Sequence, residues 1–240
     1  MKYSLAQRAW AECIGTAFLV TAVVGSGIMA ERLAGGNVAV ALLANTIATG
    51  AALVALILTL AEISGGHLNP VVTLSSALTG DFSWGEAPHY VLGQIFGGAG
   101  GVLIAHLMFG LPLVSLSHHA RSGSAQAFSE FVATFGLLAV IHRCARRGSS
   151  VVAAAVGGYI TAAYWFTAST SFANPAVTLA RCMTDTFAGI QPENVPLFIA
   201  AQLAGGATAT LLCRRLSRAD FGVKSMSAQK KTPRHDAGAL

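Results

Sequence analysis

The sequence SGGHLNPVVT at residues 64–73 has a shorter counterpart, ANPAVT, at residues 173–178. In each copy an asparagine stands directly before a proline. Asparagine is a favoured N-cap residue, and proline fits the first turn of a helix, where its missing N–H costs nothing. The apolar segments that carry the motifs, residues 68–78 and 173–183, are too short to cross a bilayer, which takes about 20 residues. The pattern therefore predicts two re-entrant half-helices, each beginning next to an asparagine.

The two motifs belong to a longer internal repeat. Upstream of them, residues 11–16 (AECIGT) align with residues 129–134 (SEFVAT). Downstream, residues 90–98 (YVLGQIFGG) align with residues 198–206 (FIAAQLAGG). These matches occur in the same order in both halves, which indicates that the second half of the chain duplicates the first.

Six stretches are long and apolar enough to cross a bilayer. They are, with approximate boundaries, residues 9–29, 38–60, 88–109, 128–144, 151–168 and 195–212. Each repeat holds three of them, an odd number, so the second copy enters the membrane from the opposite side. We therefore predict an all-α membrane protein with six transmembrane helices and two re-entrant half-helices in an inverted repeat. The apolar runs are continuous rather than alternating, which excludes a transmembrane β-barrel.

The composition and the charge distribution agree with this arrangement. Only 10% of the 240 residues are charged, whereas about 25% of an ordinary soluble domain is charged. With both termini on one side, that side receives all 15 Lys and Arg residues except Arg32, Arg121 and Arg181. The positive-inside rule then predicts a multi-pass protein of the cell (inner) membrane with both termini in the cytoplasm. Because topology explains the basic residues, no nucleic-acid partner is expected.

The chain divides into a membrane domain and a tail. The membrane domain spans residues 1–216, with repeat one at about 5–110 and repeat two at about 125–216. Residues 217–240 are polar and basic and show no apolar periodicity. We predict that this segment is a disordered cytoplasmic tail, which can touch anionic lipid.

The N-termini of the half-helices would meet near the middle of the membrane. Each carries roughly half a positive charge and unpaired N–H donors, and Asn69 and Asn174 add side-chain donors. Such a site favours neutral molecules with lone pairs and repels cations. Glu12 and Glu130 occupy equivalent positions in the first and fourth spans. A carboxylate in a span either anchors the structure, here by accepting loop N–H groups, or lines a path for solutes, and we favour the anchoring interpretation.

The residues quoted above resemble the major intrinsic protein family, the aquaporins and aquaglyceroporins. The resemblance rests on residues 64–73, on residues 173–178 and on the signature from Glu12 to Thr16, and it covers about residues 5–216. It implies that residues 1–216 are a channel domain that assembles as a homotetramer with one pore per subunit. Its partners would be small neutral solutes and the lipid bilayer, and no cofactor, metal or enzymatic activity is expected. The resemblance assigns the pore to the residues of the two Asn-Pro motifs, which are Asn69, Pro70, Val71, Asn174, Pro175 and Ala176.

The family's second constriction, the aromatic/arginine filter, can be carried over by its spacing from the two asparagines. The four positions are Thr49, Ala162, Ser171 and Val177. The family usually has an arginine at the last position and at least one aromatic ring, and this set has neither. Together with the change of the first motif to Asn-Pro-Val, this predicts a wide pore that is not restricted to water. Arg181, four residues after Val177, either reaches back toward the filter or extends to the outer surface or to loop carbonyls.

A filter without arginine is similar to that of bacterial aquaglyceroporins associated with arsenic resistance. The resemblance therefore implies a passive channel for small uncharged solutes, foremost arsenite and methylated arsenicals, with glycerol, urea and water also permeant. Three alternatives remain. A general glycerol and water facilitator would share the same residues. An ion-coupled secondary transporter would need an ionisable residue at the middle of the membrane, and a non-conducting scaffold would need bulky residues that plug the pore.

Overall fold

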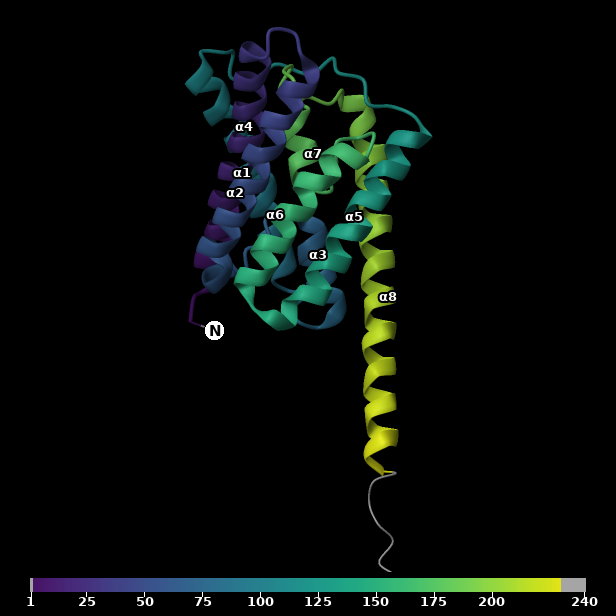
Figure 1. Ribbon diagram of the computed structural model, residues 1–240. Coiled ribbons are helices and arrows are strands. Elements are labelled where there is room, and N and C mark those ends of the chain that lie inside the picture. The colour runs from purple at the N-terminus through teal and green to yellow at the C-terminus, as the bar shows by residue number, and fades with distance from the viewer. Residues whose placement is uncertain (1, 230–240) are drawn as a thin grey trace, which may run out of the picture.

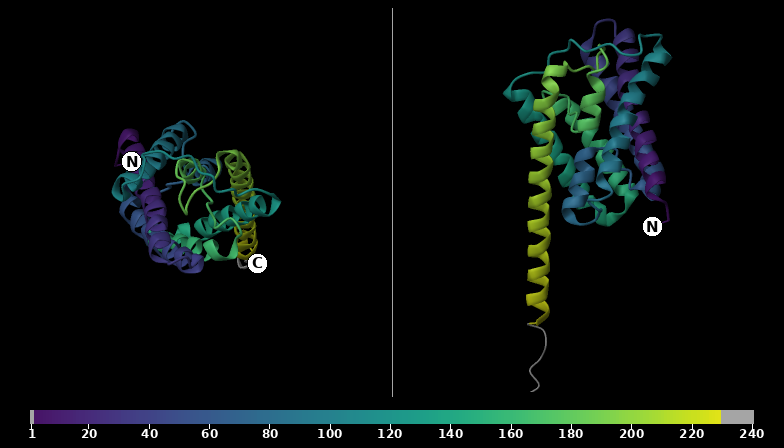
Figure 2. Two further views of the ribbon diagram at one scale, coloured as in Figure 1. Left: turned by 90° about the horizontal axis from the view of Figure 1, so that it is seen from above. Right: turned by 180° about the vertical axis from the view of Figure 1, so that it is seen from behind.

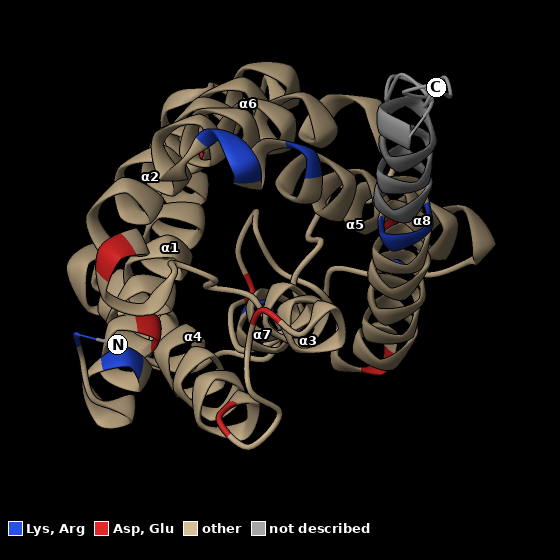
Figure 3. Cartoon of the chain, turned by 90° about the horizontal axis from the view of Figure 1, so that it is seen from below, with Lys and Arg blue, Asp and Glu red and all other residues tan. Residues whose placement is uncertain are grey.

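The computed structural model of the protein describes residues 2–229, with side chains described as far as Leu216. Within these residues, six helices are long and apolar enough to cross a membrane, as the sequence predicts. They form a ring to which each repeat contributes three helices (Figure 1, Figure 3). The six are α1 (Leu5–Leu33), α2 (Val38–Ser64), α4 (Ala87–Phe109), α5 (Ser124–Cys144), α6 (Ser149–Phe166) and α8 (Val195–Gln229). Two short 3₁₀ turns, η1 (Ala145–Arg147) and η2 (Pro192–Asn194), precede α6 and α8.

Two shorter helices, α3 (Pro70–Thr79) and α7 (Pro175–Arg181), lie inside the ring (Figure 2, Figure 3). Each begins at the proline of its motif and is capped by the asparagine before it. Asn69 Oδ1 accepts a hydrogen bond from the N–H of Val71 at 2.9 Å, and Asn174 Oδ1 accepts one from the N–H of Ala176 at 3.0 Å. α3 lies in the half of the bundle that holds the start of the chain, and α7 lies in the opposite half (Figure 1). The predicted half-helices thus approach each other from opposite ends.

The two repeats share the same internal packing. α1 packs on α4, and its counterpart α5 packs on α8. Glycines allow this close approach, because a methyl group at Gly97 would collide with the carbonyl of Cys13, and one at Gly205 with the carbonyl of Phe131. Contacts through small residues are a common way for helices to approach closely in membranes. α2 packs on α6, and this contact joins the two repeats.

The start of α1 and the last turns of α8 extend from the same end of the bundle (Figure 1, Figure 2). An ion pair between Arg8 and Glu86, with a 2.6 Å distance between Nη2 and Oε1, ties α1 to the start of α4 at this end. The hydrogen bonds from the Arg8 guanidinium hold the pKa of the Glu86 carboxyl below its ordinary value. The first and third spanning helices of repeat one are therefore joined at this end by charge as well as by packing.

The last helix differs in length from the sequence prediction. The predicted tail begins at residue 217, whereas α8 stays helical to Gln229. Between Pro196 and Pro233 no proline removes a backbone N–H, so nothing in this stretch forces the helix to end. The rest of the predicted tail, residues 230–240, lies outside the described residues.

We predict that Gly97→Ala destabilises the bundle. The added methyl group meets the Cys13 carbonyl, so α1 and α4 must move apart, and overpacking of this kind costs about 1–3 kcal/mol. The melting temperature of the purified protein in detergent should fall. Gly100→Ala is the matched control, because no atom lies within 4 Å of a methyl group built there. Equal melting temperatures for the two variants would contradict the packing argument.

Candidate functional site

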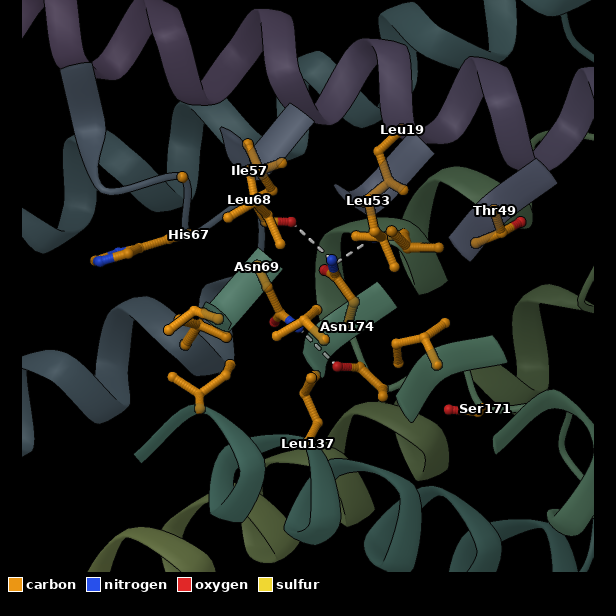
Figure 4. A pocket seen from close by; sticks show the side chains of 18 of the residues that line it. Leu19, Thr49, Leu53, Ile57, His67, Leu68, Asn69, Leu137, Ser171 and Asn174 are labelled. Carbon is orange, nitrogen blue, oxygen red and sulfur yellow. Dashed lines mark hydrogen bonds between the residues drawn. The ribbon is translucent and has the colours of Figure 1, made fainter. Parts of the chain in front are cut away.

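A cavity of about 340 Å³ lies inside the ring, between the two repeats. Its walls come from α1, α2, α5 and α6, and from the half-helices with the loops that precede them. Figure 4 shows Asn69 and Asn174 at the middle of this cavity, His67 toward one end, and Thr49 and Ser171 toward the other. Leucine and isoleucine side chains of α1, α2 and α5 cover the remaining sides. The cavity is thus an apolar passage with polar groups concentrated where the half-helices meet.

The two motif asparagines connect the half-helices to each other. Asn69 Nδ2 donates a hydrogen bond to the carbonyl of Ala173, and Asn174 Nδ2 donates one to the carbonyl of Leu68, each at 2.7 Å (Figure 4). A side-chain amide has two N–H donors, and each of these bonds uses one of them. Both asparagines line the cavity, so the second N–H of each is available to a solute.

The residue before each asparagine has an unusual backbone conformation. Leu68 has φ of 50° and Ala173 has φ of 49°, both in the left-handed region. Residues with a Cβ adopt this region at a penalty of about 1–2 kcal/mol. The conformation lets the carbonyls of Leu68 and Ala173 accept the hydrogen bonds from the asparagines of the opposite repeat. Other parts of the fold must therefore hold these two loops in place.

Two buried carboxylates hold the loops. Glu12 accepts hydrogen bonds from the backbone N–H groups of His67, at 2.9 Å, and Leu68, at 2.6 Å. In the second repeat, Glu130 accepts from the N–H groups of Phe172 and Ala173, each at 2.9 Å. Each carboxylate accepts hydrogen bonds from two backbone N–H groups of one loop. Both carboxylates therefore hold residues that adjoin the motif asparagines.

A glutamine completes each carboxylate site. Gln94 Nε2 donates to Glu12 Oε2 at 2.7 Å and to Thr73 Oγ1 at 3.0 Å. Gln202 repeats this arrangement with Glu130 Oε2 at 2.6 Å and Thr178 Oγ1 at 2.8 Å. Both carboxylates are completely buried, and neither is among the described residues that line the cavity. Their geometry is that of anchors rather than of groups on a solute path.

The other residues of the Asn-Pro motifs do not line the cavity. Pro70, Val71, Pro175 and Ala176 are buried, but none is among the described lining residues. Val71 points instead toward Gly206 of α8, where an added methyl group would collide with its side chain. The valine of Asn-Pro-Val therefore fills a contact between helices and does not face the cavity.

Three of the four predicted filter positions lie in the cavity wall, and the fourth does not. Thr49, Ser171 and Val177 line the cavity, whereas Ala162 is exposed on the outside of α6. Tyr164 takes its place, and its hydroxyl donates a 3.3 Å hydrogen bond to Thr49 Oγ1. Two residues along a helix correspond to a rotation of about 200°, so an offset of two selects the opposite face. The assignment of Ala162 to the filter rests on its spacing from Asn174. The residues between them include a loop with left-handed residues, which does not preserve the helical register.

The wall also contains a guanidinium. Arg181 lines the cavity and is only 2% exposed, so it does not extend to the outer surface; of the predicted alternatives, it bonds a loop carbonyl. Its Nε donates to the carbonyl of Ala188, and its guanidinium carbon lies 3.4 Å from the centre of the Phe172 ring. The four predicted filter positions hold neither a ring nor a guanidinium, but two other residues bring these groups to the cavity wall. Tyr164 supplies the ring and Arg181 the guanidinium.

His67 is a lining residue that the sequence analysis did not assign to the pore. Its Nδ1 lies 3.1 Å from Thr73 Oγ1, and its ring packs near those of Phe82 and Tyr90. The only sequence signal was its place in the first motif, two residues before Asn69. The contact with Thr73 orients the His67 ring at the end of the cavity that is far from Thr49 (Figure 4).

Six spanning helices in an inverted repeat, with two half-helices whose asparagine caps meet in one cavity, define a membrane channel of the aquaporin type. The chain belongs to the major intrinsic protein family. The family model described as Major intrinsic protein matches residues 1–151 and 145–237. Members of this family are channels and not enzymes, so the protein is a multi-pass membrane channel for small solutes.

Individual relatives agree with this assignment. The chain is 51% identical to aquaglyceroporin AqpS of Rhizobium meliloti (strain 1021) over 215 residues, which cover 90% of this chain and 92% of the relative. It is 33% identical to aquaporin NIP1-4 of Oryza sativa subsp. japonica, with 86% of this chain and 76% of the relative covered. The X-ray structure of the aquaglyceroporin from Plasmodium falciparum superposes with a TM-score of 0.66 at 21% identity, covering 88% of this chain and 95% of that one. The structural match supports the fold.

We predict that Glu130→Gln weakens the second loop. A glutamine has one side-chain oxygen, so its amide N–H₂ would face one of the N–H groups of Phe172 and Ala173, and a buried donor without an acceptor costs about 1–3 kcal/mol. Thermal stability and water flux per folded protein should both fall. Glu31→Gln serves as control because Glu31 is exposed. A Glu130→Gln protein with unchanged stability and flux would show that the carboxylate is not an anchor.

Proposed function

We propose that the protein is a passive channel for trivalent metalloids, foremost arsenite and methylated arsenicals, and that glycerol, urea and water also permeate. The observation that carries the proposal is Val177, an apolar side chain of the cavity wall at the position where the family usually has an arginine. The trihydroxides of arsenic and antimony are uncharged near neutral pH and resemble a folded polyol. Their hydroxyls and their compact shape match a passage that offers Thr49 and Ser171 hydroxyls beside apolar walls.

Charge selection in this proposal comes from the half-helices. The N-termini of α3 and α7 point at the middle of the cavity, and each carries a partial positive charge. In a low-dielectric surrounding, partial charges act strongly on ions. Neutral solutes can accept hydrogen bonds from the free N–H groups of Asn69 and Asn174, whereas the partial positive charges repel hydronium and metal cations. In this proposal Asn69 and Asn174 select solutes by their charge. Selection by size comes from Thr49, Ser171 and Val177.

A general glycerol and water facilitator is the second candidate, and one observation favours it. Tyr164 and Arg181 both line the cavity. An aromatic ring and a guanidinium are the elements of an ordinary glycerol-type filter, so glycerol could be the principal solute. The similarity to a relative named an aquaglyceroporin is compatible with either candidate.

We further propose the assembly and orientation that the family resemblance implies. The channel domain, residues 1–216, forms a homotetramer in the cell (inner) membrane with one pore per subunit. Both ends of the described chain extend from one end of the bundle, and basic residues in the connection between α5 and α6 lie at this end (Figure 3). The positive-inside rule assigns that end to the cytoplasm. Residues 217–240 then form a basic cytoplasmic segment.

One experiment distinguishes the metalloid channel from the general glycerol and water facilitator. Purified protein is reconstituted into proteoliposomes, and stopped-flow light scattering compares water, glycerol and arsenite flux with that of empty vesicles. Arsenite flux comparable to that of glycerol supports the metalloid proposal. Protein-dependent glycerol flux with arsenite flux at the level of empty vesicles would establish the general facilitator instead.

We predict that Val177→Arg reduces arsenite and glycerol flux by about tenfold or more, while part of the water flux remains. The larger side chain fills the cavity at this level, and a narrow polar pore passes water before larger solutes. The same proteoliposome assay measures the effect. Val177→Thr is the matched control, because it keeps the width and only replaces one methyl group by a hydroxyl. Unchanged arsenite flux in folded Val177→Arg protein would refute the role assigned to pore width.

We predict that Asn174→Asp admits cations. A carboxylate at the cap of α7 neutralises the positive end of the helix in the middle of the cavity, so the barrier to cations falls. A proton or sodium leak through proteoliposomes under an applied gradient measures this. Asn37→Asp is the control, because Asn37 caps α2 in the same way but is exposed outside the cavity. No leak in a folded Asn174→Asp channel would locate the charge barrier elsewhere.

A further inference from the structure

A groove of about 210 Å³ lies outside the pore, between the half-helix α3 and the spanning helix α8. Trp84 and Leu203 line it and are exposed, so it opens on the outside of the ring. Its two hydroxyls, those of Ser75 and Thr210, bond each other at 2.7 Å, and the rest of its wall is apolar. Apolar cavities take apolar ligands rather than water. We call this feature the outer groove; its walls include Val71, Leu74 and Leu78 of α3 and Leu203, Ala207 and Thr210 of α8.

A guanidinium stands at one end of the outer groove. Arg214 follows Thr210 by four residues, so it lies on the same face of α8 and about 6 Å further along the helix. Its Nη1 donates a 2.7 Å hydrogen bond to the carbonyl of Leu78, which also lines the groove. The groove is therefore apolar along its length and positively charged where it ends.

Most of the Arg214 guanidinium remains available to a ligand. A guanidinium has five N–H donors, and the bond to the Leu78 carbonyl uses one of them. Among the described residues, no carboxylate forms an ion pair with Arg214, which is partly exposed. Phosphate oxygens suit this group because they can accept two parallel N–H bonds. The groove and the arginine together match an amphiphile with an apolar chain and an anionic head.

The corresponding place in the other repeat is covered by the chain itself. In the aligned repeats, Met183 takes the position of Leu78, and the N–H of Ser115, in the connection between α4 and α5, donates to its carbonyl at 3.0 Å. The position of Arg214 is taken by His106, which is buried. α8 instead runs straight on, away from the bundle (Figure 1). As far as the chain is described, no connection after α8 returns to cover the outer groove.

The half-helix α3 separates the outer groove from the pore. Val72 and Ser76 line the central cavity, whereas Val71 and Ser75, one residue before each, line the groove. A molecule in the groove therefore lies behind the half-helix that Asn69 caps, and it supports that helix from the side away from the pore.

We propose that the outer groove and Arg214 bind one anionic phospholipid, from the leaflet at the end of the bundle where α8 extends. One acyl chain lies in the groove against α3 and α8, and the phosphate accepts hydrogen bonds from Arg214. Trp84, at the mouth of the groove, is a residue type that membrane proteins enrich at the level of the headgroups. The site is separate from residues 217–240, and it does not depend on which solute passes the pore.

Native mass spectrometry of the purified full chain in detergent tests the binding. Dioleoylphosphatidylglycerol is titrated, and dioleoylphosphatidylcholine, which has the same chains and no net charge, is the reference lipid. The first phosphatidylglycerol should bind about tenfold more tightly than phosphatidylcholine, as expected for hydrogen bonds between charged groups. Inorganic phosphate at the same concentration should not compete, because it lacks the acyl chain. Equal affinity for the two lipids, or competition by phosphate, would overturn the proposal.

Arg214→Ala should remove the preference for phosphatidylglycerol and leave phosphatidylcholine binding unchanged. Arg215→Ala is the matched control, because it removes the same charge from the next residue, which is exposed and forms no bond to α3 among the described residues. This control should keep the preference. Equal losses in the two variants would show that the lipid responds only to the net charge of this end, and the site would be overturned.

Ala207→Leu tests the groove without touching the arginine. The larger side chain takes the space of the acyl chain, so the affinity for phosphatidylglycerol should fall by about tenfold. Ala204→Leu is the control, because Ala204 is exposed on α8 and is not among the described lining residues. If Ala207→Leu dissociates an oligomer and leaves lipid binding unchanged, a second copy of the chain covers the groove and the proposal is overturned.

The support of α3 by the lipid is measured as water flux. Flux per protein in phosphatidylcholine proteoliposomes should rise when phosphatidylglycerol is included, because the lipid holds the half-helix at the pore. Arg214→Ala should remove this difference, and Arg215→Ala should keep it. Equal wild-type flux in the two membranes would overturn the support of α3. A channel that excludes arsenite can still show or lack the effect, so the result is independent of the metalloid proposal.

Discussion

The structure depends on two buried carboxylates that hold two loops in a conformation the chain would not otherwise keep. Glu12 and Glu130 each accept two backbone N–H groups, and a glutamine N–H₂ completes each site. In a membrane no water replaces such bonds, so each loop is strongly held. The left-handed Leu68 and Ala173 persist because several interactions determine their conformation together. Their carbonyls can then accept hydrogen bonds from the asparagine side chains of the opposite repeat.

That interaction turns two half-helices into one pore. Asn69 and Asn174 do three things at once: each caps a helix, donates across to the other repeat, and retains an N–H that faces the cavity. The positive ends of α3 and α7 are thereby fixed in the middle of the cavity, and under the proposed function they select against cations there. The close contacts at Gly97 and Gly205 keep the surrounding helices near enough for the carboxylates to reach the loops.

The cavity wall places an apolar side chain close to polar ones. Val177 leaves room at one level, whereas Tyr164, Arg181 and Ser171 gather polar groups nearby. Under the proposed function, a mainly apolar passage with polar groups in its wall suits compact polyhydroxyl molecules, which carry both kinds of surface.

The sequence by itself determined the spans, the inverted repeat, the half-helices and their asparagine caps. These features depend on local properties, namely apolar length, cap chemistry and the fixed φ of proline, so they can be predicted without knowledge of the fold. Only the tertiary structure decided which side chains face the pore. Ala162 and Tyr164 are two residues apart yet point to opposite sides of α6, and Val71 turns toward α8 although it belongs to the pore motif. Successive residues of a helix point about 100° apart, so a shift of one or two positions changes which side chain faces the pore. The left-handed residues between α6 and α7 break the helical register, so the residue that faces the pore depends on how this loop is anchored.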